Sequence, residues 1–316
     1  MNSASPQPLV SIGIPTYNRA NGKLLNVIRR ALEQTYQNVE VIVSDNCSSD
    51  NTTEVVQSVK DARLKYVRHE TNIGANNNFN HCLKEANGEY FLLFHDDDMI
   101  DVDFVETCIS SLKEGVTVGA IFTGIRIIDS EDNIIKESKN MAGGLAPIEF
   151  VLGWFDSVLP LYLPSTLYNT QLLREEGGFA SKRNLYPDLV ATFKLIAKYD
   201  RSDVVDVKAS FRRHESNMSL FTAIDAWVDD ALYVLDVLYE LFPDDSYILK
   251  DQGRKYLCGK MYGQASIEAN AFKRIFTYLK IYRSFDYCYS PIKYFYGNEF
   301  SKRFFAKIFR MLGLKK

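Results

Sequence analysis

Three adjacent aspartates, Asp96, Asp97 and Asp98, close a run of mostly apolar residues at positions 89–95. Carboxylates this close together repel one another, and a bound cation relieves that repulsion. Oxygen ligands of this kind suit Mg²⁺ or Mn²⁺, which usually keep coordination positions for the phosphates of a substrate. A second interpretation is a solvated acidic turn that caps a helix beginning near Asp101. The residues by themselves leave both interpretations open.

A second polar cluster, residues 44–50, follows an apolar run and precedes a helical pattern. Ser49 or Asp50 is suited to cap that helix through a side-chain oxygen. Asp45 stands at the end of the apolar run itself and is not needed for capping. A lone carboxylate at a strand end could accept a hydrogen bond from the edge of a nucleotide base.

The elements around these clusters alternate between strand-like and helix-like patterns from Leu9 onward. Short runs rich in Val, Ile and Phe, separated by segments of helical spacing, predict an α/β fold with a mostly parallel sheet flanked by helices. Ligands of such sheets bind beyond the carboxyl ends of the strands. Polar clusters follow four of the predicted strands, at residues 15–19, 44–52, 68–78 and 95–98. We therefore expect one shared edge, in a domain spanning residues 1–220, followed by a helical C-terminal region at 221–316.

Composition indicates a folded protein and the compartment in which it functions. The chain has 316 residues, of which 46% are hydrophobic and 24% charged, as expected for a folded protein. Its five cysteines form no C-x-x-C pair, which favours a reducing compartment. The N-terminus does not resemble a signal peptide, and no segment approaches the roughly 18 apolar residues of a membrane span. These observations predict a cytoplasmic protein.

The C-terminal tail differs in charge from the rest of the chain. Residues 270–316 hold 11 Lys and Arg against two acids, although the whole chain has a net charge of −3. A helix over residues 300–313 would be aromatic on one side and basic on the other. Such a helix could contact the inner face of the cell membrane or pack on the protein. No nucleic-acid-binding module is recognised, so we expect no nucleic-acid partner.

Four segments in this order, residues 10–19, 41–52, 72–80 and 94–98, make the sequence similar to family 2 glycosyltransferases of the GT-A fold. The resemblance covers about residues 8–220, roughly two-thirds of the chain. It implies a nucleotide-sugar donor, with UDP-sugar expected first and dTDP- or GDP-sugars open. It also implies Mn²⁺ or Mg²⁺ as cofactor.

The resemblance also implies roles for individual residues. In the family the matching positions bind the nucleotide sugar, which here gives Pro15, Thr16, Tyr17, Arg19, Asp45, Arg68, Asp96 and Asp97. Asp45 would read the uracil base, Asp96 would lie beside the ribose, and Arg68 matches a contact to the phosphates or ribose. The metal ligands would be Asp97, Asp98 and His214. The register is ambiguous because His95 occupies the first position of the usual D-x-D-D, so either Asp97 or Asp98 is the main ligand.

Asp188, in a segment at 184–195 that resembles the family's acidic motif, is implied as the catalytic base. Its other role is a favourable charge in the first turn of a helix after Pro187. The implied activity is inverting, hexosyl-type transfer to a hydroxyl of a glycan or lipid-linked acceptor in bacterial surface-polysaccharide synthesis. Alternatives are a non-catalytic nucleotide-binding scaffold of this fold and a nucleotidyltransferase, whose glycine-rich basic signature is missing.

Overall fold

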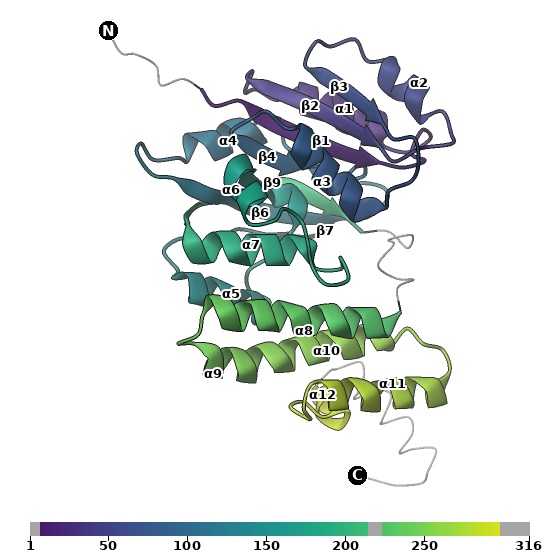
Figure 1. Cartoon of the computed structure of the whole chain (residues 1–316), viewed down its shortest axis with the longest axis vertical. Coiled ribbons are helices and arrows are strands. Elements are labelled where there is room, and N and C mark those ends of the chain that lie inside the picture. Colours follow the sequence, from purple (N-terminus) through teal and green to yellow (C-terminus); the bar gives the residue numbers. More distant parts are fainter. Residues whose placement is uncertain (1–6, 214–222, 298–316) are drawn as a thin grey trace. The chain divides into compact units, whose positions relative to one another are not determined.

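The computed structural model describes residues 7–213 and 223–297 (Figure 1). The chain divides into two compact units, residues 1–217 and 218–316. Two features of the sequence lie outside the described residues: His214 and the amphipathic segment 300–313.

The first unit is built on one mixed sheet. Its strand order is β3-β2-β1-β4-β8-β6-β9-β5, with β7 paired to β6. The strands are β1 (Val10–Thr16), β2 (Val39–Asp45), β3 (Leu64–Arg68), β4 (Tyr90–Leu93), β5 (Met99–Ile100), β6 (Val118–Ile128), β7 (Ile134–Ser138), β8 (Thr166–Asn169) and β9 (Asp200–Arg212). Strands β3, β2, β1 and β4 are mutually parallel, and β8 pairs antiparallel with both β4 and β6. The expected α/β class is confirmed.

Helices flank this sheet and form the second unit. In the first unit they are α1 (Leu24–Leu32), α2 (Thr52–Gln57), α3 (Ala75–Glu85), α4 (Phe104–Ser110), α5 (Pro147–Phe155), η1 (Leu163–Ser165), α6 (Thr170–Glu175) and α7 (Pro187–Lys198). In the second unit they are α8 (Ile224–Leu241), α9 (Ser246–Ile248), η3 (Leu249–Gly253), α10 (Arg254–Ala265), α11 (Ala271–Ser284) and α12 (Pro291–Gly297). None of the helices within the described ranges is long and apolar enough to cross a membrane.

Strand β1 shows how the centre of the sheet is buried on both faces. Ile12 and Ile14 are fully buried in the core that also contains Leu24 of α1. Gly13 between them faces the other side of the sheet, because neighbouring strand residues point to opposite faces. A Cβ at Gly13 would lie 2.7 Å from Cβ of Cys82 on α3, so glycine allows this helix to approach the strand closely. Both faces of β1 are thus covered by helices.

The acidic run, Asp96 to Asp98, lies between two strands. Strand β4 ends at Leu93, and the next amide, that of Phe94, donates to Gly13 O at 2.8 Å. Strand β5 follows directly after Asp98 and pairs with β9. Helix α4 therefore begins at Phe104 and not near Asp101, so the acidic residues do not cap a helix as the second interpretation supposed.

The second unit packs around aromatic side chains. Tyr262 of α10 is fully buried, and its hydroxyl donates to Tyr289 O at 2.8 Å. The rings of Tyr278 and Tyr294 lie 5.5 and 5.2 Å from the Tyr262 ring. Aromatic pairs at these separations add to the stability that burial alone provides.

Candidate active site

The carboxyl ends of three parallel strands bring predicted site residues into one row. Thr16 at the end of β1 is paired in register with Asp45 of β2, which is paired in turn with Arg68 of β3. Strand β4 continues the row on the other side of β1, and the acidic run follows its last residue. The expected convergence of polar strand ends on one edge is confirmed.

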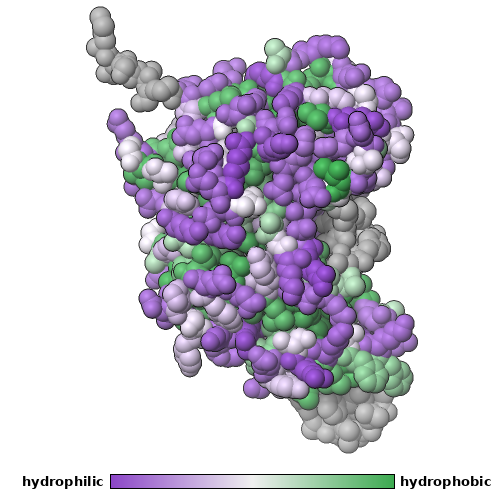
Figure 2. Space-filling view, in the orientation of Figure 1, coloured by the Kyte–Doolittle hydropathy of each residue, from purple (hydrophilic) through white to green (hydrophobic). Residues whose placement is uncertain are grey.

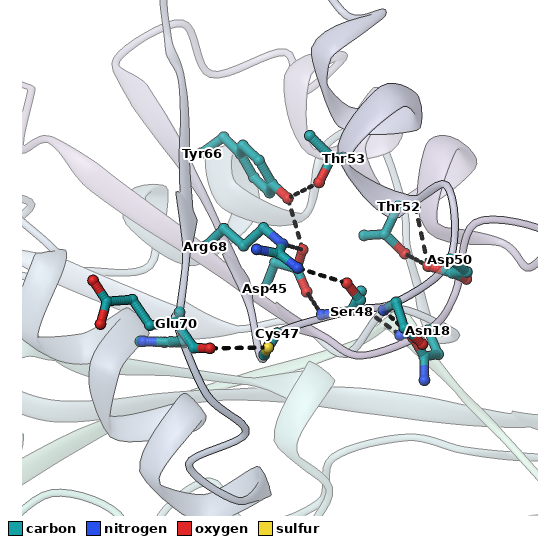
Figure 3. A network of polar contacts seen from close by, with 12 residues as sticks. Asn18, Asp45, Cys47, Ser48, Asp50, Thr52, Thr53, Tyr66, Arg68 and Glu70 are labelled. Carbon is teal, nitrogen blue, oxygen red and sulfur yellow. Dashed lines mark hydrogen bonds and ion pairs between the residues drawn. The ribbon is translucent and has the colours of Figure 1, made fainter.

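Asp45 forms the buried centre of a polar network (Figure 3). Its Oδ1 accepts the Ser48 amide at 2.8 Å, and its Oδ2 accepts the Tyr66 hydroxyl at 2.7 Å. Arg68 Nε lies 3.6 Å from Oδ2, and Arg68 Nη2 donates to Ser48 O at 2.9 Å. Burial, followed by the hydrogen bond to Asp45, raises the pKa of Tyr66 to about 12, so this hydroxyl remains a donor.

The side chains of Asp45 and Arg68 differ strongly in their exposure to solvent. The Asp45 side chain is 0% exposed, whereas the Arg68 side chain is 44% exposed. A ligand approaching the edge therefore meets the Arg68 guanidinium before the Asp45 carboxylate. Sequence reasoning located Asp45 at the edge but missed Tyr66, which lies two residues before Arg68 on the same face of β3.

The loop after β1 is fastened to the loop after β2. The Asn18 amide donates to Ser48 Oγ at 2.8 Å, and the Ser49 amide donates back to Asn18 Oδ1 at 2.8 Å. Asn18 has φ of 54°, a left-handed conformation that asparagine tolerates well. Asp50 accepts the Ala20 amide at 2.9 Å and the Thr52 amide at 3.1 Å, so it joins both loops as well as the start of α2.

These fastened loops carry the other predicted nucleotide-binding residues. Pro15 and Thr16 are buried at the strand end, and Tyr17 is 47% exposed on the rim. Arg19 extends toward the acidic run, with Nε 3.6 Å from Asp96 Oδ1 and Nη2 3.9 Å from Asp97 Oδ2. A half-exposed cation beside carboxylates can bind a phosphate while it remains near a metal site.

The three aspartates differ in burial. The side-chain exposures of Asp96, Asp97 and Asp98 are 11%, 23% and 1%. Asp98 Oδ1 accepts the Arg212 amide at 2.9 Å, and the Arg212 guanidinium donates through Nε to Asp97 O at 2.6 Å and through Nη1 to Asp129 O at 2.7 Å. Arg212 is itself 4% exposed, so it supports the acidic run from the protein interior.

The donor atoms fit a divalent cation. One ligand atom each from His95, Asp97 and Asp98 lies within 4.8 Å of the others. Asp98 Oδ2 is buried and makes no hydrogen bond within residues 7–213 and 223–297. Burial and the Asp97 charge raise the pKa of Asp96 to about 6, although its contacts to Thr16 and Arg19 oppose that rise. Such crowding of carboxylates is relieved by a cation with oxygen ligands.

His95 was not among the ligands expected from the sequence. Its Nδ1 lies 3.6 Å from Asp98 Oδ2. Burial alone would lower the pKa of His95, but contact with Asp98 and the charges of Asp97 and Asp96 raise it. Its position directly before the aspartates was the available signal.

The burial of Asp96 predicts a pH-dependent stability effect. The folded-state pKa, about 6, is above the usual 3.8, so ionisation favours the unfolded chain. The penalty is absent below about pH 4, grows as pH rises, and is complete above about pH 6. We expect Asp96→Asn to raise the free energy of unfolding in metal-free buffer by up to about 3 kcal/mol near pH 7.5, with little gain near pH 4.

Urea unfolding at the two pH values measures this difference, with the exposed Glu114→Gln as the matched control. An equal gain at both pH values would show that the effect comes from packing and not from ionisation.

Strand topology determines where Asp188 lies. Helix α7 leads into β9, and Leu195 in its last turn and Tyr199 directly after it face Gly119 near the start of β6. Through β8, strand β6 has the same direction as β4 and β1. The first turn of α7 therefore lies toward the carboxyl edge of the sheet, where the acidic run is found. Asp188 is half-buried in that turn.

Two other aspartates near α7 have different surroundings. Asp203 is paired with Arg201 at 2.9 Å, and its Oδ1 also accepts a hydrogen bond from the side-chain Nδ2 of Asn140 at 3.2 Å. Asp200 begins β9 opposite Val118, at the far end of the sheet from the acidic run. The sequence offered Asp156, Asp200 and Asp203 as alternatives without the motif context of Asp188, and Asp156 directly follows α5. The role of Asp188 as the base stays a prediction.

The fold and the carboxyl-edge site define an α/β protein of the GT-A class. S. aureus TarS 1–349 in complex with UDP-GlcNAc has a similar fold, with a TM-score of 0.59 at 16% identity, covering 88% of this chain and 90% of that one. The Pyrobaculum calidifontis mannosyltransferase PcManGT in complex with GDP-Man and Mn²⁺ gives 0.55 at 18% identity, covering 89% and 82%.

Sequence comparison assigns the family. Residues 11–184, more than half of the chain, match glycosyl transferase family 2, and the chain belongs to this family. Chondroitin synthase of Escherichia coli is 30% identical over 135 residues, 42% of this chain and 19% of that protein. The Campylobacter jejuni GalNAc(5)-diNAcBac-PP-undecaprenol beta-1,3-glucosyltransferase is 35% identical over 133 residues, 41% and 42%. The chain thus spans less than half the length of these curated relatives.

Proposed function

We propose that the protein is a metal-dependent, inverting glycosyltransferase that uses a UDP-sugar and a hydroxyl of a glycan or lipid-linked glycan, in bacterial surface-polysaccharide synthesis. The carrying observation is the single edge that gathers Asp45 with Arg68, the acidic run with Arg19, and the first turn of α7. The names of the two relatives, a polysaccharide synthase and a glucosyltransferase acting on a PP-undecaprenol-linked glycan, support the acceptor class. The UDP-GlcNAc complex of TarS supports the donor class.

Different residues at the edge are suited to different parts of the nucleotide. Tyr17 presents an exposed ring beside the strand end, which suits stacking on the uracil base. Arg68 and Arg19 are partly exposed cations on two sides of the edge, suited to the ribose and diphosphate. Asp45 is buried next to Arg68 and orients its guanidinium. For Asp45 itself to accept a hydrogen bond from the base, Arg68 or Tyr66 must move aside.

Asp97, with Asp98 and His95, would hold Mn²⁺ or Mg²⁺, and His214 is proposed as a further ligand or diphosphate contact. When bound, the ion supplies neutralisation of charge on the departing nucleoside diphosphate. Asp188 takes the proton from the acceptor hydroxyl while the hydroxyl oxygen forms the bond to the anomeric carbon. The bond from that carbon to the donor phosphate breaks on the opposite face, which inverts the configuration.

Calorimetric titration with UDP, with Mn²⁺ or with EDTA, tests this proposal. We expect Mn²⁺-dependent binding that Asp45→Asn weakens about tenfold, because Arg68 loses the partner that orients it. Glu114→Gln, an exposed acidic position away from the edge, should bind as the unchanged protein does. Titrations with GDP and dTDP test the choice of base. Failure to bind any nucleoside diphosphate under all metal conditions would contradict both the transferase and the nucleotide-binding scaffold.

A further inference from the structure

Helix α11 carries a continuous apolar stripe on its exposed side. Phe272, Ile275, Phe276 and Leu279 are 77%, 54%, 71% and 54% exposed. Their spacing of three and four residues places them on one face of the helix. Tyr278 and Ile281 hold the opposite face, at 5% and 1% exposure. The helix is thus already packed on its own unit through one side, and the stripe is additional apolar surface.

This stripe differs from the scattered apolar residues that all protein surfaces carry. Four large side chains in two turns form a contiguous patch, and such patches mark docking surfaces. Burying a Phe, Leu or Ile side chain is favourable relative to leaving it in water. Burial of the stripe against a partner therefore contributes favourably to the free energy of binding.

Charge indicates which partner fits. Helix α11 contains no acidic residue, and Lys273, Lys280 and Arg283 are exposed on it. Lys280 also contacts Asp225 at 2.6 Å, but both side chains are 61% exposed, so water and salt weaken that pair. On α11 itself the charged side chains beside the stripe are all cations, a combination that suits an apolar layer beneath an anionic surface. In Figure 2 the described surface around α11 shows hydrophobic beside hydrophilic residues.

We propose that α11 docks in the headgroup region of an anionic lipid bilayer, with Phe272, Ile275, Phe276 and Leu279 inserted and the lysines against the headgroups. The basic composition of residues 270–316, with 11 Lys and Arg against two acids, adds long-range attraction to the same surface. This surface goes beyond the proposed catalytic function, because vesicle binding requires neither donor nor acceptor.

Sedimentation of the full chain with phosphatidylcholine vesicles, with and without phosphatidylglycerol, tests the proposal. We expect binding that needs phosphatidylglycerol and weakens at high salt. The double variant Phe272→Ser/Phe276→Ser should reduce the partition coefficient at least about tenfold. Lys273→Gln/Lys280→Gln should reduce it by a similar factor only with the anionic lipid, since the attraction of basic side chains to headgroups requires an anionic surface. Tyr247→Ser is the matched control, since Tyr247 is an aromatic residue of α9 that is 85% exposed.

Three results would overturn the proposal. Unchanged vesicle binding of the phenylalanine variant would assign binding to another part of the chain. A lower thermal unfolding midpoint of that variant without lipid, together with unchanged vesicle binding, would show that the stripe is covered within the protein itself. A vesicle-independent dimer that this variant converts to a monomer would identify a second copy as the partner. UDP titration of the same variants separates all three from any failure of the donor site.

Discussion

Asp188→Asn is expected to lower turnover by about two to four orders of magnitude, the usual contribution of a general base. Binding of UDP should stay within about twofold of the unchanged protein, because the proposed nucleotide contacts lie on β1, β2, β3 and the acidic run. Asparagine keeps the shape of the side chain but cannot take a proton at neutral pH. The substitution therefore separates proton transfer from donor binding, measured by steady-state kinetics and calorimetry with the same protein sample.

Asp200→Asn provides the matched control for this result. Asp200 is an exposed aspartate two residues after the last residue of α7, at the end of the helix away from the acidic run. Its removal changes the charge near the same helix by the same amount, so loss of activity in the Asp188 variant alone would reflect position. If both variants kept full turnover with a UDP-sugar, Asp188 would have only its helix-dipole role.

The edge of the sheet was predictable from sequence because its signals are local. Strands β1 and β2 are buried runs that end in polar residues, and β4 is a buried run with polar residues shortly after it; parallel strands bring such ends together. The resemblance to family 2 then assigned roles that periodicity cannot provide. Asp45 illustrates the limit: its place at the edge follows from its strand, but its complete burial beneath Tyr66 and Arg68 depends on the pairing register with β3.

Features that join distant parts of the chain were harder to predict. Strand β8 has only four residues, yet it pairs with both β4 and β6 in the middle of the sheet. The Arg212 amide meets an Asp98 oxygen 114 positions away, which no local pattern indicates. The stripe of α11 has the spacing of a core face, and only packing reveals that its other side is the buried one.

Comparing Asp97→Ala with Asp98→Ala tests which of these two aspartates is the main metal ligand. Asp97 is the most exposed of the three aspartates, at 23%, and its removal should abolish the Mn²⁺ dependence of UDP binding. Loss of several kcal/mol of metal stabilisation corresponds to at least about a 10³-fold lower turnover. Its thermal unfolding midpoint in metal-free buffer should not fall, because removing one of three crowded carboxylates relieves repulsion.

Asp98→Ala should weaken metal binding as well, but with a cost in stability that Asp97→Ala lacks. Asp98 is 1% exposed and accepts the amide of the buried Arg212, so alanine leaves that donor without its acceptor. An unsatisfied buried donor costs about 1–3 kcal/mol, which urea unfolding resolves. Mn²⁺ titration of both variants without nucleotide then identifies the main ligand. If Asp98→Ala alone abolished Mn²⁺ binding while Asp97→Ala retained it, the assignment of these two aspartates would be reversed.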